Sequence, residues 1–130
     1  MAPQVVLVTG ALTGIGRATA VAFANKGAKV VVSGRHDDKG QALIAELKAL
    51  GAEAEFVRAD VTKEDEVRNL VDKAVARFGR IDVAVNNAGV EGETGPIQDA
   101  TVENFRAVHD TNVLGVFLSM KYELRLPPAI

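Results

Sequence analysis

Short apolar runs alternate along this chain with segments of helical periodicity, and this alternation restricts the possible folds more than any other feature. An uninterrupted apolar run indicates a strand that is covered on both faces, as strands are in a parallel sheet with helices above and below it. One of the four runs is more polar than the others, as an edge strand would be. The predicted strands are Val5–Val8, Lys29–Val32, Ile81–Val85 and the more polar Glu53–Arg58.

A helical pattern follows each predicted strand. The clearest one covers Val67–Phe78, where apolar residues recur at i, i+3, i+4, i+7, i+8 and i+11. Thr62, followed three residues later by Asp65, predicts the start of this helix as a near capping box, and Gly79 predicts its end. Gly115 lies inside the last pattern and indicates close helix packing. The other three patterns begin after Gly16, cover Leu43–Leu50 ahead of Gly51, and cover Phe105–Leu124 as one long helix.

This order of strand and helix, repeated four times, predicts the fold. Strands that alternate with helices form right-handed strand–helix–strand units, and such units build a doubly wound parallel sheet. We therefore expect a single α/β domain over residues 1–130, a three-layer Rossmann fold with the strand order 3-2-1-4. A crevice then opens at the carboxyl ends of the first and fourth strands, where the winding direction reverses, and ligands bind there.

A glycine-rich turn, Thr9–Gly16, lies between the first predicted strand and the first predicted helix. Glycines let the backbone approach a phosphate without a Cβ between them, and the N–H groups and the helix dipole then face the anion. The spacing is Gly-x3-Gly-x-Gly rather than the usual dinucleotide fingerprint, and no Lys-Ser/Thr pair follows as in a Walker loop. An ordinary glycine-rich turn remains the alternative. The predicted phosphate-binding residues are Gly10, Leu12, Thr13, Gly14, Ile15 and Gly16.

Three further motifs occur in order after this turn. Asp60-Val61 follows the third predicted strand, Asn86-Asn87-Ala88-Gly89 follows the fourth, and Asn112 lies within Thr111–Gly115 on the last helix. Together with Thr-Gly-x3-Gly-Ile-Gly after the first strand, they make the chain resemble the short-chain dehydrogenase/reductase family from Val5 to Leu124. The resemblance implies a nicotinamide dinucleotide as cofactor, and an oxidoreductase that transfers hydride between this cofactor and a small-molecule alcohol or ketone.

The resemblance also implies roles for these residues. Asp60 would accept a hydrogen bond from the adenine amino group, with the Val61 main chain beside the same ring. The backbone of Asn87, Ala88 and Gly89 would pass along the adenosine ribose, whereas Asn86 would be structural. Asn112 is the catalytic residue that the resemblance supplies, as the holder of a water that connects a lysine to solvent. A polar strand end at Asp60 and an amide that fills a polar gap at Asn112 remain the alternatives.

The end of the second predicted strand bears on the choice between NADP and NAD. An NAD site normally has an acidic residue here, which holds the ribose 2′-hydroxyl, but this chain has Gly34. The next residue, Arg35, can pair with a 2′-phosphate through two hydrogen bonds and can stack on adenine. These residues favour NADP. Asp37 and Asp38 lie close by in the sequence and could reach a ribose, so NAD remains the alternative.

The charge, the residue composition and the hydropathy of the chain argue against several other classes of protein. The formal net charge of −2, without a run of five like charges, indicates no nucleic-acid partner. The chain has no cysteine and two histidines, so we expect no disulfide, no cysteine nucleophile and no metal site. No apolar run reaches the roughly 18 residues of a membrane span, and the first residues lack the basic segment of a secretory signal. These features predict a cytoplasmic protein without membrane contact, and the resemblance implies a homo-oligomer, either a dimer or a tetramer.

The Tyr-x-x-x-Lys pair, which the family uses as acid/base and to hold the nicotinamide ribose, has no counterpart here. The residue four places after Tyr122 is Leu126, no lysine follows Lys121, and Ser119 lies in the wrong segment to be the family's serine. We therefore interpret the chain as the amino-terminal, cofactor-binding half of such an enzyme, inactive by itself. Tyr122 is then expected on a helix surface or at an interface, and a fourth strand left at the sheet edge would favour self-association.

Two other functions remain open. A catalytically silent dinucleotide-binding or regulatory module would have the same motifs. A methyltransferase with a related nucleotide fold is less consistent with the sequence, because it needs an acidic residue at the end of the second strand, where Gly34 stands.

Overall fold

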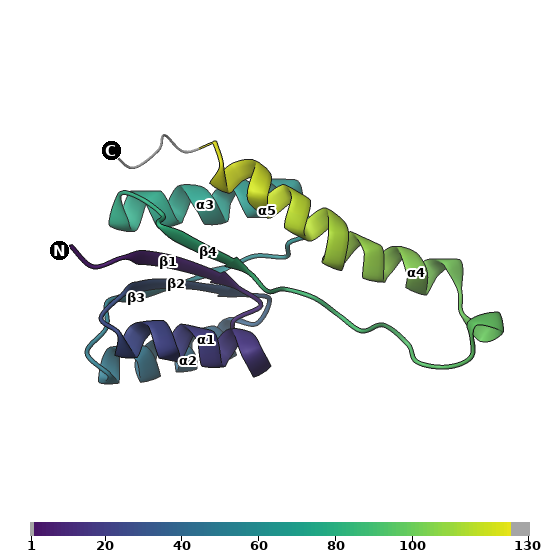
Figure 1. Cartoon of the computed structure of the whole chain (residues 1–130), viewed down its shortest axis with the longest axis horizontal. Helices are drawn as coiled ribbons and strands as arrows, with labels where there is room; N and C mark the ends of the chain where they lie inside the picture. Colours follow the sequence, from purple (N-terminus) through teal and green to yellow (C-terminus); the bar gives the residue numbers. More distant parts are fainter. Residues whose placement is uncertain (1, 126–130) are drawn as a thin grey trace.

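Four parallel strands form the sheet at the centre of the computed structural model, which describes residues 2–125 (Figure 1). The strands are β1 (Val5–Thr9), β2 (Lys29–Gly34), β3 (Ala54–Arg58) and β4 (Val83–Asn86), and their order is β3-β2-β1-β4. This is the order expected for a Rossmann fold, so the predicted fold class is confirmed. The register pairs Thr9 with Asn86 and Gly34 with Arg58, which brings the carboxyl ends of the strands to one edge of the sheet.

β4 begins at Val83 rather than at the predicted Ile81. Asp82 instead anchors the preceding turn to the start of β1. Its N–H donates to the Val5 carbonyl and its Oδ2 accepts from the Val5 N–H, both at 2.8 Å. Arg80 holds the same carboxylate, with 2.9 Å between Nε and Oδ2. The regular ladder therefore starts only after this anchor.

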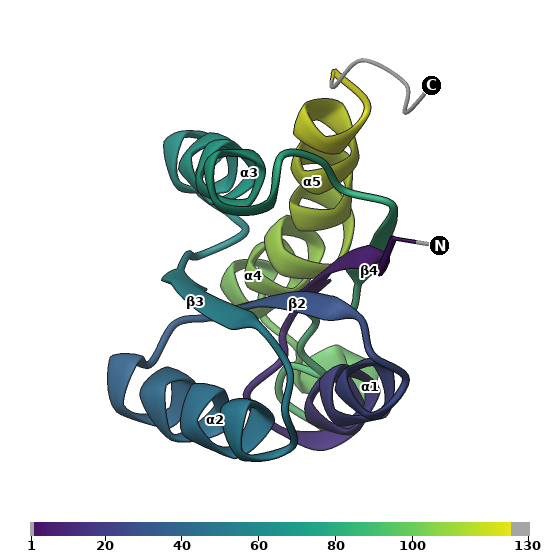
Figure 2. The same ribbon diagram turned by 90° about the vertical axis from the view of Figure 1, so that its left-hand side faces the viewer.

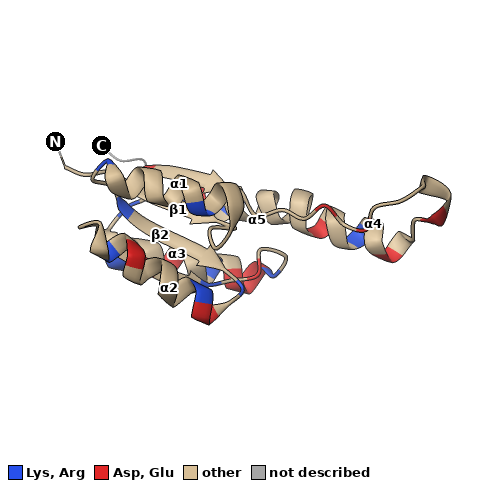
Figure 3. Cartoon of the chain, turned by 90° about the horizontal axis from the view of Figure 1, so that it is seen from below, with Lys and Arg blue, Asp and Glu red and all other residues tan. Residues whose placement is uncertain are grey.

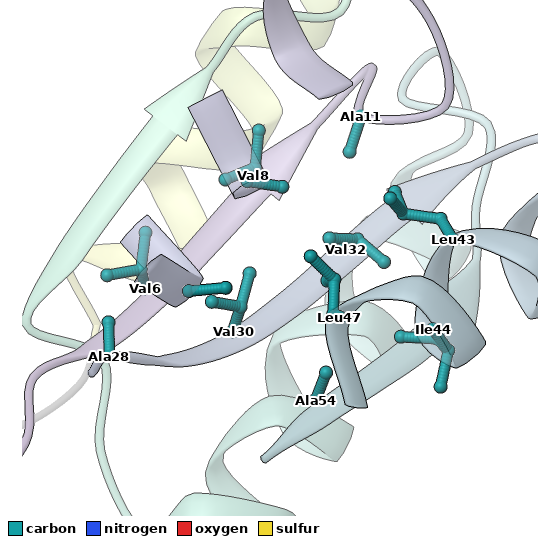
Figure 4. Close-up of a cluster of buried hydrophobic side chains, with 12 residues drawn as sticks. Val6, Val8, Ala11, Ala28, Val30, Val32, Leu43, Ile44, Leu47 and Ala54 are labelled. Carbon is teal, nitrogen blue, oxygen red and sulfur yellow. The ribbon is translucent and has the colours of Figure 1, made fainter. Parts of the chain in front are cut away.

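Helices cover both faces of the sheet. α1 (Gly14–Asn25) and α2 (Asp37–Ala49) cover one face, and α3 (Glu64–Phe78) and α5 (Gly115–Glu123) cover the other (Figure 2). Successive side chains of a strand point to opposite faces, so each strand contributes to both apolar clusters. Figure 4 shows the cluster beneath α1 and α2, which includes Val6, Val8, Val30 and Val32. The cluster beneath α3 and α5 includes Leu7, Val31, Leu70 and Leu118. The central strands are thus buried on both faces, as their uninterrupted apolar runs predicted.

α2 and α3 end just before Gly51 and Gly79, as the sequence predicts. The start of α3, however, differs from the prediction. α3 ends before Gly79, whose φ of 85° is left-handed, and α2 ends two residues before Gly51. Lys63, not Thr62, precedes the first residue of α3, so the predicted capping box is wrong. Thr62 is engaged elsewhere, because its hydroxyl and its N–H both donate to Asp60 Oδ1, at 2.8 and 2.9 Å.

The predicted long last helix is interrupted. A π-helical turn, η2 (Asp110–Leu114), joins α4 (Val102–His109) to α5, and a short 3-10 helix, η1 (Ile97–Asp99), precedes α4. Figure 1 shows α4 and α5 as one continuous rod whose α4 end projects beyond the sheet. At the start of α5, a Cβ on Gly115 would lie 2.6 Å from Val61 Cγ2. The close packing predicted at this glycine is therefore confirmed.

Tyr122 is buried, which contradicts the expectation of a surface or interface position. It is 6% exposed and belongs to the apolar cluster beneath α3 and α5. Its hydroxyl donates to Glu64 Oε2 at 2.8 Å, and Lys121 Nζ lies 2.6 Å from the same oxygen. These hydrogen bonds, first that of Lys121 and then that of Tyr122, lower the pKa of Glu64. The ring can be buried because Glu64 satisfies its hydroxyl group.

The described residues also bear on membrane and metal binding. Within residues 2–125, no helix combines the length and the apolar character that a bilayer crossing requires. The same residues contain no group of three His, Cys, Asp or Glu side chains arranged to hold a metal ion.

Figure 3 shows the distribution of charged residues. Residues of both charge signs occur on α2 and on α4.

Candidate functional site

A cavity of about 670 Å³ lies at the edge of the sheet where the strands end. Four segments bound it: those between β1 and α1, between β2 and α2, and between β3 and α3, and the segment after β4. All predicted cofactor-binding residues except Gly16 line this cavity, whereas Asn112 does not. The lining residues are Gly10, Leu12, Thr13, Gly14, Ile15, Ser33, Gly34, Arg35, His36, Lys39, Ala59, Asp60, Val61, Asn87, Ala88, Gly89, Val90, Glu91 and Thr111.

The turn between β1 and α1 brings the N-terminus of α1 to the cavity. Gly10 and Gly14 have φ angles of 60° and 57°, in the left-handed region that favours glycine. Thr13 precedes the helix in an extended conformation, and its side chain makes no capping hydrogen bond. The first N–H groups of a helix have no partner within it and carry partial positive charge. This end of α1 can therefore receive an anionic group, with the Thr13 hydroxyl as a further donor.

Gly16 lies beneath the turn rather than in the cavity wall. A Cβ at Gly16 would collide with the Gly10 carbonyl oxygen and would lie 2.5 Å from Asn87 Nδ2. A Cβ at Gly10 would lie 2.7 Å from Ala88 Cα. These two glycines therefore let the turn, the helix and the segment after β4 approach one another. Gly14, by contrast, lines the cavity, and a Cβ there would meet nothing within 4 Å, so the turn is open on this side.

Asn86, the last residue of β4, and Asn87, which follows it, attach the strand to different neighbours. Asn87 Nδ2 donates to the Gly10 carbonyl at 3.0 Å, and the Ala88 N–H donates to Thr9 Oγ1 at 3.2 Å. Both bonds join the residues after β4 to the end of β1 and the turn that follows it. Asn86 instead donates from Nδ2 to Glu123 Oε1 of α5 at 2.9 Å. Asn86 thus has a structural position, and the residues from Asn87 onward form the cavity wall.

Two cationic residues, Arg35 and Lys39, belong to the wall beyond the end of β2. The main chain is held here by Arg58, whose Nε donates to the Arg35 carbonyl at 3.2 Å. Gly34 presents no side chain, so the β2 end itself brings no carboxylate to the cavity. Asp37 and Asp38, the sequence alternatives for a ribose contact, lie in the first turn of α2 and are not among the lining residues.

Asp60 lies just after β3, and its negative charge is stabilised by its surroundings. Burial raises the pKa of its carboxyl, but the hydrogen bonds from Thr62 and the charges of Arg35 and Lys63 outweigh this effect and leave the pKa below its ordinary value. Both Thr62 bonds go to Oδ1. Oδ2 therefore remains available as an acceptor for a ligand in the cavity.

Asn112 lies in the π-helical turn, and its side chain is paired with the backbone of Val90. The Val90 N–H donates to Asn112 Oδ1 and Asn112 Nδ2 donates to the Val90 carbonyl, both at 2.8 Å. A Cβ on Gly89 would lie 3.3 Å from the same Oδ1. Asn112 thus holds the segment that follows the predicted cofactor wall, and its neighbour Thr111 reaches the cavity.

Sequence reasoning missed several lining residues. Lys39 lies in the first turn of α2, whereas Arg35 precedes the helix and its cap residue His36, so no helical spacing relates the two cations. Ser33, at the end of β2, is 1% exposed, and its hydroxyl has no hydrogen-bond partner among the described residues. No local pattern indicates His36 or Thr111, because their positions at the cavity depend on how distant segments meet.

Comparison with known proteins agrees with this geometry. The profile described as short chain dehydrogenase matches residues 4–126. The 3beta-hydroxysteroid dehydrogenase of Mediterraneibacter gnavus is 37% identical over 123 residues, which make up 95% of this chain and 45% of that protein. The L-fucose dehydrogenase of Oryctolagus cuniculus is 42% identical over 120 residues, or 92% of this chain and 41% of that protein.

Solved structures give the same result for the fold. The crystal structure of NAD+-bound xylitol dehydrogenase matches with a TM-score of 0.91 at 37% identity, over 94% of this chain and 47% of that chain. The chain therefore spans less than half the length of these relatives and corresponds to their amino-terminal part.

Proposed function

Because the chain belongs to the short-chain dehydrogenase family, we propose that it binds a nicotinamide dinucleotide in the cavity at the carboxyl ends of the strands. The observation that carries this proposal is the turn after β1, which directs the N-terminus of α1 to the cavity between β1 and β4. A diphosphate is the anionic part of such a cofactor. It would be held by the first N–H groups of α1 and by the Thr13 hydroxyl.

The remaining cofactor-binding residues would hold the adenosine half. Asp60 would accept from the adenine amino group through the oxygen that Thr62 leaves available, and Val61 would lie beside the ring. The backbone of Asn87–Gly89 would form the wall at the ribose, held in place by the Asn87 bond to Gly10. The lowered pKa of Asp60 supports its role as an acceptor at neutral pH, since its carboxyl is then ionised.

We propose that the whole protein is an oxidoreductase for a small alcohol or ketone. The bound nicotinamide supplies the hydride donor or acceptor, and the residues of this chain bind and orient the cofactor. Tyr122 is the single tyrosine of the chain, and it is buried against Glu64 rather than directed to the cavity. The 130 residues by themselves are therefore expected to act as a silent binding module, without hydride transfer. A cytoplasmic location and a homo-oligomeric state belong to the same proposal.

Asn112 supports this function as a positioning residue. Its reciprocal bonds to Val90 hold the backbone immediately after the Asn87–Gly89 wall. The proposed catalytic contribution of Asn112 is therefore made through this segment and through a water that it holds for a lysine outside these 130 residues.

We further propose that NADP is preferred over NAD. Arg35 and Lys39 lie in the wall at the β2 end, and Gly34 contributes no carboxylate that would repel a 2′-phosphate. Guanidinium groups pair with phosphate through two parallel hydrogen bonds, which makes Arg35 the main determinant. NAD remains the second candidate, because the related xylitol dehydrogenase structure holds NAD+.

Calorimetric titration of the chain with NADPH and NADH tests both proposals. We expect NADPH to bind more tightly, and Arg35→Ala to remove most of the difference by weakening NADPH about tenfold or more, since a bond to a charged group contributes about 1.5–3 kcal/mol. Arg68→Ala, on α3 and away from the cavity wall, is the matched control and should leave both affinities unchanged. Absence of binding by either cofactor would refute the proposed function, whereas unchanged selectivity in Arg35→Ala would refute only the role of Arg35.

A further inference from the structure

Gly34 stands where a side chain would be blocked by one neighbour. Its φ lies outside the left-handed region, so its backbone would accept any residue. A Cβ built on Gly34 would nevertheless lie 2.5 Å from both Cγ and Cδ1 of Leu12. Steric contact with Leu12, rather than backbone conformation, therefore disfavours a side chain at position 34.

The backbone on both sides of this contact is fixed. The Ala11 N–H donates to the Ser33 carbonyl at 3.0 Å, which binds the turn after β1 to the end of β2. The Ala59 N–H donates to the Gly34 carbonyl at 3.1 Å, which holds Gly34 against the residue after β3. Ala11 is fully buried, so the turn cannot shift outward without opening the core. Any side chain introduced at position 34 must therefore displace the Leu12 side chain.

Leu12 is partly buried and packs against the apolar cluster beneath α1 and α2, so displacement of its side chain costs part of this packing. Its isobutyl group occupies the volume into which a residue-34 side chain would project. Leu12 and Gly34 both line the cavity, next to Arg35. An apolar side chain thus fills the part of the wall where an acidic residue would accept hydrogen bonds from a ribose diol.

We propose that Leu12 is a specificity-determining residue, which excludes a carboxylate from position 34 and thereby disfavours a cofactor with a free ribose 2′-hydroxyl. This inference rests on the proposed function and adds a second determinant to it. Arg35 attracts the phosphorylated cofactor, whereas Leu12 occupies the space that a hydrogen-bonding side chain at position 34 would need. Selectivity that combines an attractive element with an excluding one is common in specific binding sites.

A double-mutant cycle on the 130-residue chain tests this inference. The proteins are the wild type, Leu12→Ala, Gly34→Asp and the double variant, and the dissociation constants for NADH and NADPH are measured for each. In the presence of Leu12, we expect Gly34→Asp to change NADH affinity by less than about twofold. In the Leu12→Ala background, we expect the same substitution to tighten NADH about tenfold, because the carboxylate can then reach the ribose.

A second cycle measures the contact without any cofactor. Gly34→Ala adds only the Cβ that would meet Leu12. We expect Gly34→Ala to lower the denaturant midpoint in the presence of Leu12 and to have no such effect in the Leu12→Ala background. This cycle remains informative if Gly34→Asp does not fold, and an equal loss of stability in both backgrounds would overturn the steric argument.

The outcomes separate this inference from the proposed function. A wild-type chain that binds neither nucleotide overturns both. A chain that prefers NADPH and loses the preference in Arg35→Ala, but gains NADH affinity from Gly34→Asp equally with and without Leu12, supports the proposed function and overturns the role of Leu12.

Discussion

Asn87 shows how one side chain can hold a binding turn in place. Its Nδ2 donates to the Gly10 carbonyl at 3.0 Å and lies where a Cβ on Gly16 would project. The amide therefore fixes the turn after β1 relative to the end of β4. Since a carbonyl accepts and cannot donate, only a side chain with a donor can make this bond.

Loss of this donor should loosen the proposed cofactor site. We expect Asn87→Ala to reduce the free energy of unfolding by about 1 kcal/mol, the usual net contribution of one hydrogen bond, and to weaken dinucleotide binding. Asn87→Asp keeps the size of the side chain but not the donor, so it should resemble Asn87→Ala. Denaturation and titration of both variants check this, and wild-type behaviour of Asn87→Asp would contradict the role given to the donor.

A second prediction at the scale of single residues concerns Tyr122. Because its ring is buried and its hydroxyl donates to Glu64 Oε2 at 2.8 Å, the ring and the hydroxyl can be tested separately. We expect Tyr122→Phe to cost about 0.5–1.5 kcal/mol of stability. Tyr122→Ala should cost about 3 kcal/mol or more, because it leaves a cavity. Urea denaturation measures the stability of both variants. Equal, small losses of stability in the two variants would indicate that the ring does not pack in the apolar cluster beneath α3 and α5.

At the scale of elements, the contact between β4 and α5 contains a half-buried acid, Glu123. Burial raises the pKa of Glu123, the bond from Asn86 Nδ2 lowers it, and the net result is a pKa above the ordinary value. Glu123 Oε2 and Asn86 Oδ1 have no hydrogen-bond partner among the described residues. Glu123 and Asn86 line a small cavity between β4 and α5, and Asp82, the other carboxylate that lines it, is paired with Arg80 at 2.9 Å.

This acid makes stability depend on pH. A carboxyl whose pKa is higher in the folded than in the unfolded state binds more protons when folded, so the free energy of unfolding falls as pH rises above the ordinary glutamate value of about 4.3. We expect Glu123→Gln to remove this contribution, whose slope cannot exceed about 1.4 kcal/mol per pH unit for one proton. Denaturation of both proteins between pH 4 and about 7 checks this, and parallel pH profiles would contradict it.

At the scale of the whole molecule, the rod of α4, η2 and α5 exposes apolar side chains. Val113, Phe117, Met120 and Leu124 recur at i, i+4, i+7 and i+11, and their exposed fractions are 53%, 60%, 47% and 76%. This spacing places them along one side of the helix. Within the described residues, β4 also pairs with β1 alone. Contiguous exposed apolar surface of this kind favours association.

We therefore expect the 130-residue chain to self-associate as its concentration rises. Phe117→Ser should shift the equilibrium toward monomer, because it interrupts the apolar side of α5. Val102→Ser, which changes an exposed apolar residue of α4 outside this series, is the control. Sedimentation velocity over a range of concentrations checks both variants. A wild-type chain that stays monomeric throughout would show that this surface does not mediate association.

The parts of this molecule that sequence predicts well are those set by local periodicity. The apolar runs of β1 and β2 and the glycine after α3 are local signals, and the sheet order follows from right-handed crossovers. The buried position of Tyr122 depends on Glu64, which is 58 residues away, and no local pattern indicates it. The contact of Leu12 with Gly34 likewise arises only when two turns meet, so the sequence indicated Leu12 as part of the phosphate-binding turn but did not indicate this contact.

The interruption in the last helix escaped prediction for a related reason. Apolar residues on both sides of Asp110–Leu114 fit one continuous helical pattern, and a π-helical turn leaves no compositional mark. The asparagine in its middle was instead assigned through the resemblance. Its bonds to Val90 could not be foreseen, because the segment after β4 has no regular structure around that residue.

The π-helical turn acts as an angular spacer in the rod. Such a turn contains one residue more than the α-helical pitch requires. If residues 110–114 took uniform α-helical pitch with no residue removed, the extra residue would rotate everything downstream by about 100°. Leu118 and Tyr122 would then leave the sheet-facing side, even though every other residue of the rod was unchanged. The wide turn therefore lets Asn112 bond to Val90 while Leu118 and Tyr122 of the same rod face the sheet.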